Sequence, residues 1–528
     1  MPLAFHLPSV HAPSRWQLTA CQTMLARLTL LTLLTLLTLL AVLLPSTAYA
    51  EYQQRLPIPV AQALKNAGIP PSAAAVLVQE VGAVSPRVSL NERQAFNPAS
   101  VMKLLTTYAA LDLLGPAYTW KTGAWSSGTP DKGVLTADLV LKGSGDPKLT
   151  IEQFWLLLRQ LRARGIRDIH GDLVLDRQRF ALNDAALSSV EPFDDQPLRP
   201  YNVSPDALLI NFKSVRLLLI GDARRKSLSI LAEPQPTNLD IVNQIQAVTN
   251  GRDCGDWREG LRAELTQNNN RTQLNQLSPL NSLNQLTLSG QYPLSCGEKT
   301  WHLGVMTHPQ YIFGVFSELW QELGGTISGT VRETRPSGNP QLLASIESPP
   351  LAAIIRDINK YSNNVMARQL FLTLGAEAQN KVGEENKPAT AADGEGAIRA
   401  WLTEKQLIFP GLVLENGSGL SRRERISAES LAQLLATAWK SPLMPEFIAS
   451  LPLTAVDGTM KKRLVNKSSG GQAHIKTGSL EGVKTLAGYV LDRRGKWQIV
   501  VFLVNHPNAA AAQAAQDALL QWVYERSN

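Results

Sequence analysis

Hydrophobic positions change spacing along the N-terminal part of the chain, from a helical to a strand-like and back to a helical period. Together they predict a helix, two strands and a second, strongly apolar helix, at 56–67, 73–81, 87–96 and 97–114. Asn97 and Pro98 favour the start of the second helix, and Gly115 favours its end.

The C-terminal part predicts helices first and strands afterwards. The expected helices are 351–359, 365–375 and 394–402, the strands are 473–480, 485–492 and 497–504, and a closing helix covers 508–526. Residues 377–393 are polar, and we expect a surface connection there.

The middle of the chain has a different hydrophobic pattern, with short strand-like segments and few helical ones. We expect strands at 133–142, 172–176, 215–220, 286–289 and 326–333, and helices at 154–163 and 311–323. An Asn/Gln/Thr-rich stretch at 267–285 predicts a polar loop inside a β-rich unit. Repeats of 20–50 residues are not found.

The first 50 residues resemble an export signal. Arg15 and Arg27 precede an apolar run at 28–44, and Ala-Tyr-Ala at 48–50 is a small-x-small cleavage pattern. We therefore expect a cleaved signal peptide, with a retained membrane anchor as the alternative. Met24 is an alternative start, which would give a conventional short n-region.

Composition narrows the function classes. With 44% hydrophobic and 18% charged residues the chain is an ordinary globular protein, too long at 528 residues for one compact core. The net charge of +7 is spread out, without a basic run interleaved with aromatics, so nucleic acid is not an expected partner.

Cysteine and histidine usage bears on covalent and metal chemistry. Cys21 lies in the signal, which leaves Cys254 and Cys296 as an even pair in an oxidising compartment, and we expect them to form a disulfide. The histidines show no metal-ligand spacing, so neither a metal nor a cofactor is expected.

The first chemical signal is Ser100-Val101-Met102-Lys103 at the start of the apolar helix. Positions i and i+3 share one helix face, so the Ser100 hydroxyl and the Lys103 amine can meet. The helix N-terminus favours an alkoxide at Ser100 and disfavours a protonated Lys103, which can then act as its base. An ordinary helix start with an exposed lysine is the alternative.

The second signal is Ser362 and Asn364, in a predicted break between two helices. There the Ser362 hydroxyl could relay a proton, and the Asn364 amide could hold a substrate backbone. A turn that caps the following helix explains the same residues.

The third signal lies on a predicted strand. Lys476 and Thr477 could bind a substrate carboxylate, and Gly478 would leave the strand face open. The amide of Ser479 could stabilise an oxyanion together with the amide of Ser100.

The same Lys-Thr-Gly tripeptide occurs at 121–123, between Trp120 and Trp125 and soon after the first helix. We interpret this copy as a structural strand, and it shows how weak one tripeptide is alone.

The order of the three motifs is typical of penicillin-binding proteins and related β-lactamases. The long separation between the first and the second motif resembles the low-molecular-mass class C penicillin-binding proteins of the peptidase S13 family. The segments 143–147, 416–421 and 456–459 also resemble that family, and we interpret the last two as loops framing a cleft.

The resemblance implies an α/β fold of the α+β type and a division into domains. The peptidase domain, of the penicillin-binding and serine β-lactamase type, has an antiparallel sheet between helical layers and would comprise 51–117 and 345–528. An inserted domain would cover 118–212 and 300–344, and a third domain, 213–299, would be nested within it.

The resemblance also implies an activity. It predicts an exported, periplasmic serine D-Ala-D-Ala carboxypeptidase and D,D-endopeptidase that acts on peptidoglycan stem peptides through an acyl-enzyme on Ser100. β-Lactams would be covalent inhibitors, and association with the membrane would be peripheral at most.

Three alternatives stay open. Tyr361-Ser362-Asn363 also resembles the Tyr-x-Asn motif of class C β-lactamases, with Tyr361 as the base. A β-lactamase would release a bound penicillin quickly. A non-catalytic receptor for cell wall or β-lactam would not turn over a peptide.

Overall fold

The computed structural model describes residues 56–181, 193–194, 196–249, 254–267, 283–334 and 339–525. The predicted signal peptide and its cleavage site lie outside the described residues, as does most of the polar loop expected at 267–285. Across the described ranges, none of the helices combines the length and the apolar character needed to cross a membrane.

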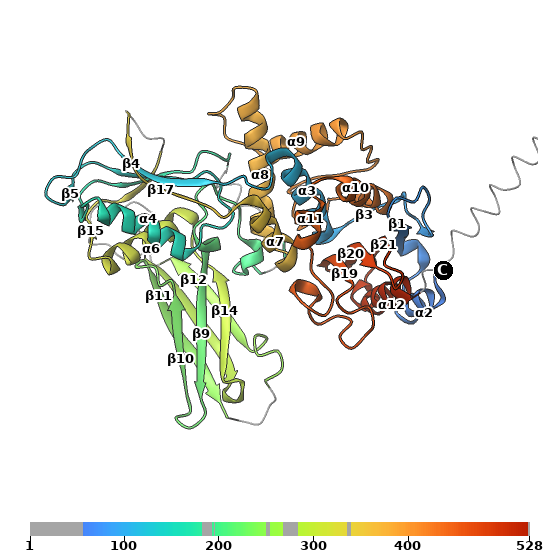
Figure 1. The fold of residues 1–528 in the computed structure, drawn as a ribbon. Helices are drawn as coiled ribbons and strands as arrows, with labels where there is room; N and C mark the ends of the chain where they lie inside the picture. Colours follow the sequence, from blue (N-terminus) through green and yellow to red (C-terminus); the bar gives the residue numbers. More distant parts are fainter. Residues whose placement is uncertain are drawn as a thin grey trace, which may run out of the picture.

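A five-stranded antiparallel sheet forms the centre of one half of the molecule (Figure 1). Its order is β19 (Ala473–Leu480), β20 (Val483–Leu491), β21 (Trp497–Asn505), β1 (Ala74–Glu80) and β2 (Val88–Leu90). The expected strand at 87–96 is interrupted, since only β2 and the short β3 (Ala95–Phe96) are extended.

Helices cover both faces of this sheet. On one face α2 (Ile58–Asn66) and α12 (Gln513–Glu525) pack on Val76 and Phe502. On the other, α3 (Lys103–Leu114) and α10 (Ala428–Lys440) pack on Leu77 and Leu503. The remaining helices of this layer are α7 (Leu351–Tyr361), α8 (Asn364–Lys381), α9 (Ala391–Glu404) and α11 (Met444–Ser450). An antiparallel sheet between helical layers confirms the predicted fold class.

Two expected boundaries were wrong. The helix predicted from residue 97 begins as a 3₁₀ helix, η2 (Ala99–Met102), and becomes α-helical at Lys103. Asn97 does not cap the α-helix, because its side chain accepts a hydrogen bond from the Ala99 amide (2.9 Å) instead. The polar connection at 377–393 starts later than expected, since α8 continues to Lys381.

The other half contains a second sheet, in the order β16 (Val331–Glu333), β8 (Leu173–Asp176), β6 (Leu139–Lys142), β4 (Lys121–Ser126) and β17 (Gln341–Glu347). Helices α4 (Ile151–Ala163) and α6 (His308–Glu322) contribute to its core. The expected strands at 133–142 and 326–333 are each split, with β5 (Val134–Leu135), β7 (Asp168–Ile169) and β15 (Thr326–Ile327) forming a small separate sheet.

Below this half, two three-stranded sheets extend away from the body (Figure 1). One has the order β10 (Ser227–Glu233), β9 (Ser214–Asp222) and β14 (Glu298–Gly304), and the other β11 (Leu239–Val248), β13 (Asn284–Pro293) and β12 (Leu261–Gln267). The structure links Cys254 and Cys296 through a disulfide, with their Cα atoms 4.9 Å apart. The borders of the two inserted domains stay predictions.

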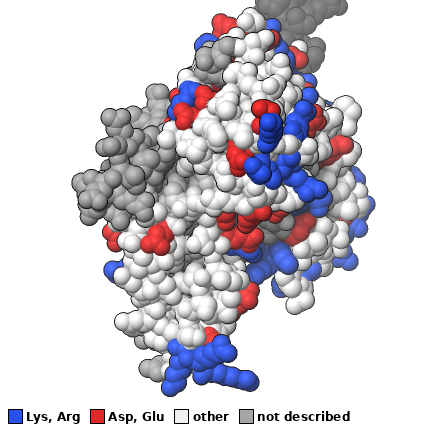
Figure 2. Space-filling view, turned by 90° about the vertical axis from the view of Figure 1, so that its left-hand side faces the viewer, with Lys and Arg blue, Asp and Glu red and all other residues white. Residues whose placement is uncertain are grey.

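Figure 2 shows Lys and Arg side chains gathered at the lower tip of the molecule. The β9–β10 hairpin forms this tip in Figure 1, and Arg224, Arg225 and Lys226 are exposed in its turn. One cluster of basic side chains therefore lies on this short turn, without aromatic side chains interleaved.

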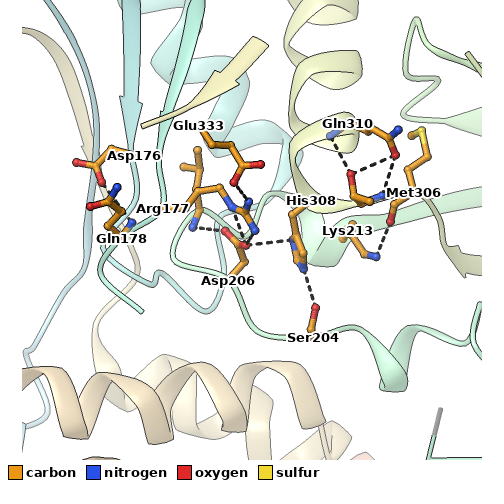
Figure 3. Close-up of polar contacts among 12 residues, drawn as sticks. Asp176, Arg177, Gln178, Ser204, Asp206, Lys213, Met306, His308, Gln310 and Glu333 are labelled. Atoms are coloured by element: carbon orange, nitrogen blue, oxygen red, sulfur yellow. Dashed lines mark hydrogen bonds and ion pairs between the residues drawn. The ribbon is translucent and has the colours of Figure 1, made fainter. Parts of the chain in front are cut away.

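A buried polar network holds the inserted region together (Figure 3). Arg177 donates from Nε to Oδ2 of the fully buried Asp206 (2.9 Å) and also binds Glu333. His308 Nδ1 lies 3.8 Å from Asp206, and its Nε2 lies 3.0 Å from Ser204 Oγ. Burial lowers the pKa of His308 to about 3, so the ring is neutral at pH 7 and Arg177 balances the Asp206 charge.

The same network joins the inserted region to α8. The Asp206 amide donates to Gln369 Oε1 (2.8 Å), and Gln369 Nε2 donates to the Asp206 carbonyl (2.7 Å). Because Gln369 is fully buried one turn and a half beyond the first residue of α8, this contact fixes the N-terminal end of the helix.

Candidate active site

The first motif forms a close hydroxyl–amine pair. Ser100 lies in η2, and Lys103, the first residue of α3, is fully buried. Lys103 Nζ lies 2.9 Å from Ser100 Oγ and 2.6 Å from Asn364 Oδ1, and it also binds the Ser418 carbonyl oxygen. The Asn364 and Ser418 oxygens therefore hold the Lys103 amine beside the Ser100 hydroxyl.

The environment disfavours a charged Lys103. Burial lowers its pKa well below the usual value, and the neighbouring Lys476 lowers it further, while Glu424 opposes the shift. Burial also lowers the pKa of Lys476 to about 7. A buried amine with a depressed pKa can accept a proton from Ser100, as a general base must.

The second motif lies in the predicted break between α7 and α8. Ser362 ends α7 in the left-handed conformation (φ 57°), and the Asn363 side chain caps α8 by accepting from the Met366 amide (3.0 Å). The capping role expected as an alternative is thus taken by Asn363, which leaves Ser362 and Asn364 to face the two lysines. Tyr361, the alternative base, is 71% exposed.

The third motif lies on β19, at the edge of the sheet beside η2. Lys476 is fully buried, and its Nζ donates to Ser362 Oγ (2.9 Å) and to the Thr477 carbonyl (2.6 Å). Thr477 Oγ1 donates to Thr459 Oγ1 (2.8 Å), and Ser479 is exposed. Lys476 and Ser362 thereby connect the second and third motifs.

Gly478 allows β19 to approach the first motif closely. A methyl group there would lie 2.8 Å from the Ser100 amide nitrogen, 2.8 Å from the Pro98 carbonyl oxygen and 2.3 Å from Thr485 Oγ1. These distances are too short for a side chain, so only glycine lets the strand and η2 pack here.

The Lys-Thr-Gly copy at 121–123 lies elsewhere, on β4 of the inserted region. The Lys121 side chain is 71% exposed and pairs with Glu347 (3.2 Å).

A functional contact that the sequence did not indicate is the Ser418 carbonyl. Its loop was expected to frame the cleft without assigned chemistry, yet this oxygen binds Lys103. Glu424 shapes the loop, since its buried Oε1 accepts from the amides of Glu415 (3.1 Å), Asn416 (3.0 Å) and Gly417 (3.0 Å). A lone acid after a Gly-rich loop was the only signal available.

In the part of the chain that the structure describes, no group of three His, Cys, Asp or Glu side chains is placed to hold a metal ion. The side chains already named can perform nucleophilic acyl transfer, because the Lys103 amine lies within hydrogen-bond reach of the Ser100 hydroxyl.

A family model described as "D-Ala-D-Ala carboxypeptidase 3 (S13) family" matches residues 56–526. The chain belongs to this family. The predicted membership and enzyme class are thereby confirmed, and the protein is an S13 D-Ala-D-Ala carboxypeptidase.

Two relatives of this S13 carboxypeptidase match over most of their length. The D-alanyl-D-alanine carboxypeptidase of Actinomadura sp. (strain R39) is 27% identical, over 80% of this chain and 76% of its own. The D-alanyl-D-alanine carboxypeptidase DacB of Haemophilus influenzae is 26% identical, over 77% and 80%.

The fold of the S13 carboxypeptidase is also found in a solved structure. The crystal structure of penicillin binding protein 4 (dacB) from Haemophilus influenzae superposes with a TM-score of 0.70, at 23% identity, over 89% of this chain and all of that one. The inserted sheets are thus part of a known architecture.

Proposed function

We propose that this S13 carboxypeptidase removes the terminal D-Ala of peptidoglycan stem peptides through an acyl-enzyme on Ser100, and that it also cleaves D,D-cross-links. The observation that carries the proposal is the buried Lys103 amine, 2.9 Å from Ser100 Oγ and with a lowered pKa. Export into the periplasm would bring the enzyme to this substrate.

The first half of the reaction is acylation. Lys103 takes the proton of Ser100 while Oγ forms a bond to the carbonyl carbon of the penultimate D-Ala. The amides of Ser100 and Ser479 stabilise the oxyanion, and each such donor typically contributes about 10²–10³-fold in rate. The C–N bond then breaks, and the leaving nitrogen takes a proton relayed through Ser362.

The second half is hydrolysis of the ester. Water adds to the acyl carbon, the bond to Ser100 Oγ breaks, and the hydroxyl regains its proton. Lys476 and Thr477 bind the substrate carboxylate, and Asn364 holds the backbone. A β-lactam acylates Ser100 in the same way, but its ring-opened amine stays tethered, which blocks the approach of water.

Carboxypeptidase and endopeptidase reactions break the same kind of bond. In the first the leaving amine belongs to a single D-Ala, and in the second to the cross-linked residue of a neighbouring stem peptide. The catalytic groups are identical, so the two activities differ only in what binds beyond the scissile bond.

The test is covalent labelling with a fluorescent penicillin, followed by mapping of the labelled peptide. We expect a stable label on Ser100, and no label and no D-Ala release in Ser100→Ala. Ser144→Ala, a serine of the inserted region, is the matched control and should keep both. Rapid loss of the label as hydrolysed penicillin would identify a β-lactamase, and labelling without peptide turnover a receptor.

A further inference from the structure

A cavity of about 550 Å³ opens directly beside the second motif. Ser362, Asn363 and Asn364 line it from the peptidase half, and the sheet β10-β9-β14 with the turn before it lines it from the inserted region. The cavity therefore adjoins the second motif, and much of its lining belongs to the inserted region.

Two turns that contribute to the lining of this cavity contain non-glycine residues in the left-handed conformation. Ser362 has φ 57°, and in the inserted region Asn211, Phe212 and Lys213 have φ 46°, 55° and 48°. A left-handed backbone is unfavourable for such residues and persists only where surrounding contacts hold it. A surface depression without a function would not require these unfavourable backbone conformations.

The contacts that hold the second turn are present. Lys213 Nζ donates to the Met306 carbonyl (2.7 Å; Figure 3), and the Asn211 amide donates to the Leu149 carbonyl (2.7 Å). The Phe212 side chain packs against the core of the peptidase half while lining the cavity. The turn thus places one aromatic side chain between the insert and the catalytic half.

The sheet contributes charges of both signs. Glu233, Arg216 and His302 are paired across β10, β9 and β14, so they form one row, and all three line the cavity. Arg216 forms an ion pair with Glu233, and both side chains remain about half exposed (47% and 62%). Together with Phe212 and Tyr201, this lining suits a peptide that carries both a carboxylate and an amine.

The position of Ser362 indicates which part of a substrate reaches the cavity. The residue that relays a proton to the leaving nitrogen must lie within hydrogen-bond reach of it. Whatever is attached to that nitrogen therefore begins beside Ser362, where the cavity opens.

We propose that this cavity binds the leaving stem peptide of a D,D-cross-link, with Arg216 and Phe212 as its main contacts. The inference rests on the proposed function, since it uses Ser362 as the proton relay. The amide C–N bond of the cross-link breaks, Ser100 keeps the acyl half as an ester, and the second peptide leaves as a free amine after gaining one proton.

The experiment compares two purified substrates with the full-length mature enzyme: a monomeric stem pentapeptide ending in D-Ala-D-Ala, and a cross-linked dimer of two stem peptides. Arg216→Ala should lower kcat/KM for the dimer at least about tenfold, mainly through KM, because a charged hydrogen bond is lost. Turnover of the monomer should change less than about twofold, since a single D-Ala does not reach the sheet.

Two further variants sharpen this result. Phe212→Gly removes the side chain and keeps a residue that tolerates the left-handed turn, and it should also reduce cleavage of the dimer selectively. Arg225→Ala is the matched control, because Arg225 likewise pairs with a neighbouring acid, Asp222 (3.7 Å), but lies at the exposed hairpin tip. It should leave both substrates unaffected.

Each other outcome overturns the inference in a distinguishable way. Equal losses on both substrates, or no loss on the dimer in either cavity variant, would exclude a leaving-peptide subsite. A wild-type enzyme that cleaves the monomer but never the dimer would exclude it while leaving the carboxypeptidase intact. A wild-type enzyme that cleaves neither would refute the proposed function itself.

Discussion

Strands β4 and β19 carry the same tripeptide, Lys-Thr-Gly, in two different surroundings. On β19 the lysine is fully buried and its amine contacts Ser362, whereas on β4 the lysine side chain is 71% exposed and pairs with Glu347. On β19, burial lowers the pKa of Lys476 to about 7.

The two glycines differ in the same way. A methyl group at Gly123 would meet the Trp125 ring at 2.6 Å, a contact within one strand. A methyl group at Gly478 would meet the Ser100 amide at 2.8 Å, a contact with the proposed nucleophile. The two identical tripeptides therefore differ in chemistry because different residues pack on them, and matched substitutions in the two copies test this difference.

The largest expected difference is between the two lysines. Lys476→Ala should lower kcat/KM for a D-Ala-D-Ala peptide by about 10²–10³-fold, because the cation near the substrate carboxylate and oxyanion is lost. Lys121→Ala should leave it unchanged, since exposed ion pairs contribute about 0–1 kcal/mol to stability and this pair lies on the sheet of the inserted region. Steady-state kinetics on both variants, with circular dichroism for folding, checks this. The reverse result would place the third motif on β4.

Alanine at the two glycines should separate activity from stability. Gly478→Ala should lower acylation by about tenfold or more, because the Ser100 backbone must shift away from an added methyl group. Gly123→Ala should cost about 1–3 kcal/mol of unfolding free energy through overpacking, while the folded fraction keeps its activity. Penicillin labelling rates and thermal melts distinguish the two, and similar labelling rates would contradict the close packing of β19 on η2.

The pH profile should report the buried lysines. Lys476 binds a carboxylate only when protonated, so kcat/KM should fall above about pH 7, approaching tenfold per unit. Lys103 accepts a proton only when it is neutral, so its protonation should cause the decline of kcat/KM on the acid side of the profile. A peptide that ends in an amide lacks the carboxylate and should lose the alkaline decline. If the amide and the acid gave the same profile, Lys476 would not be the carboxylate-binding group.

The smallest expected catalytic effect comes from the disulfide. Replacing Cys254 and Cys296 by serine should leave kcat/KM near the wild-type value, because both residues pack in the inserted core. Closing a loop of 42 residues typically stabilises by about 2–4 kcal/mol, so the insert should melt earlier. Differential scanning calorimetry resolves this, and a large loss of D-Ala release would instead couple this bond to catalysis.

Much of the site was predictable from local spacing. Ser100 and Lys103 are three residues apart at a predicted helix start, and Lys476 lies on a predicted strand, so both elements were expected. The fold class followed from the resemblance in motif order, and the family match confirms it.

The features that the sequence did not predict depend on contacts between segments far apart in the chain. The Ser418 carbonyl binds a lysine 315 positions away, and no periodicity encodes such a pair. The 3₁₀ start of the helix has a similar cause, because Ala99 adopts φ 45° and a methyl group at Gly419 would meet its carbonyl oxygen at 1.8 Å. Tertiary packing overrides the local helix preference there.

The topology of the central sheet has a consequence for the order in which the chain is synthesised and folds. Strand β1 lies between β2 and β21, so its two neighbouring strands come from opposite ends of the described chain. Gln79, for example, pairs with Ile499. Contacts of such sequence separation form late, after the intervening segments have been released. Lys476 cannot reach Ser362 until this last part of the polypeptide has arrived. We therefore expect a nascent or truncated chain to be inactive, and the proposed D-Ala release to begin only in finished molecules.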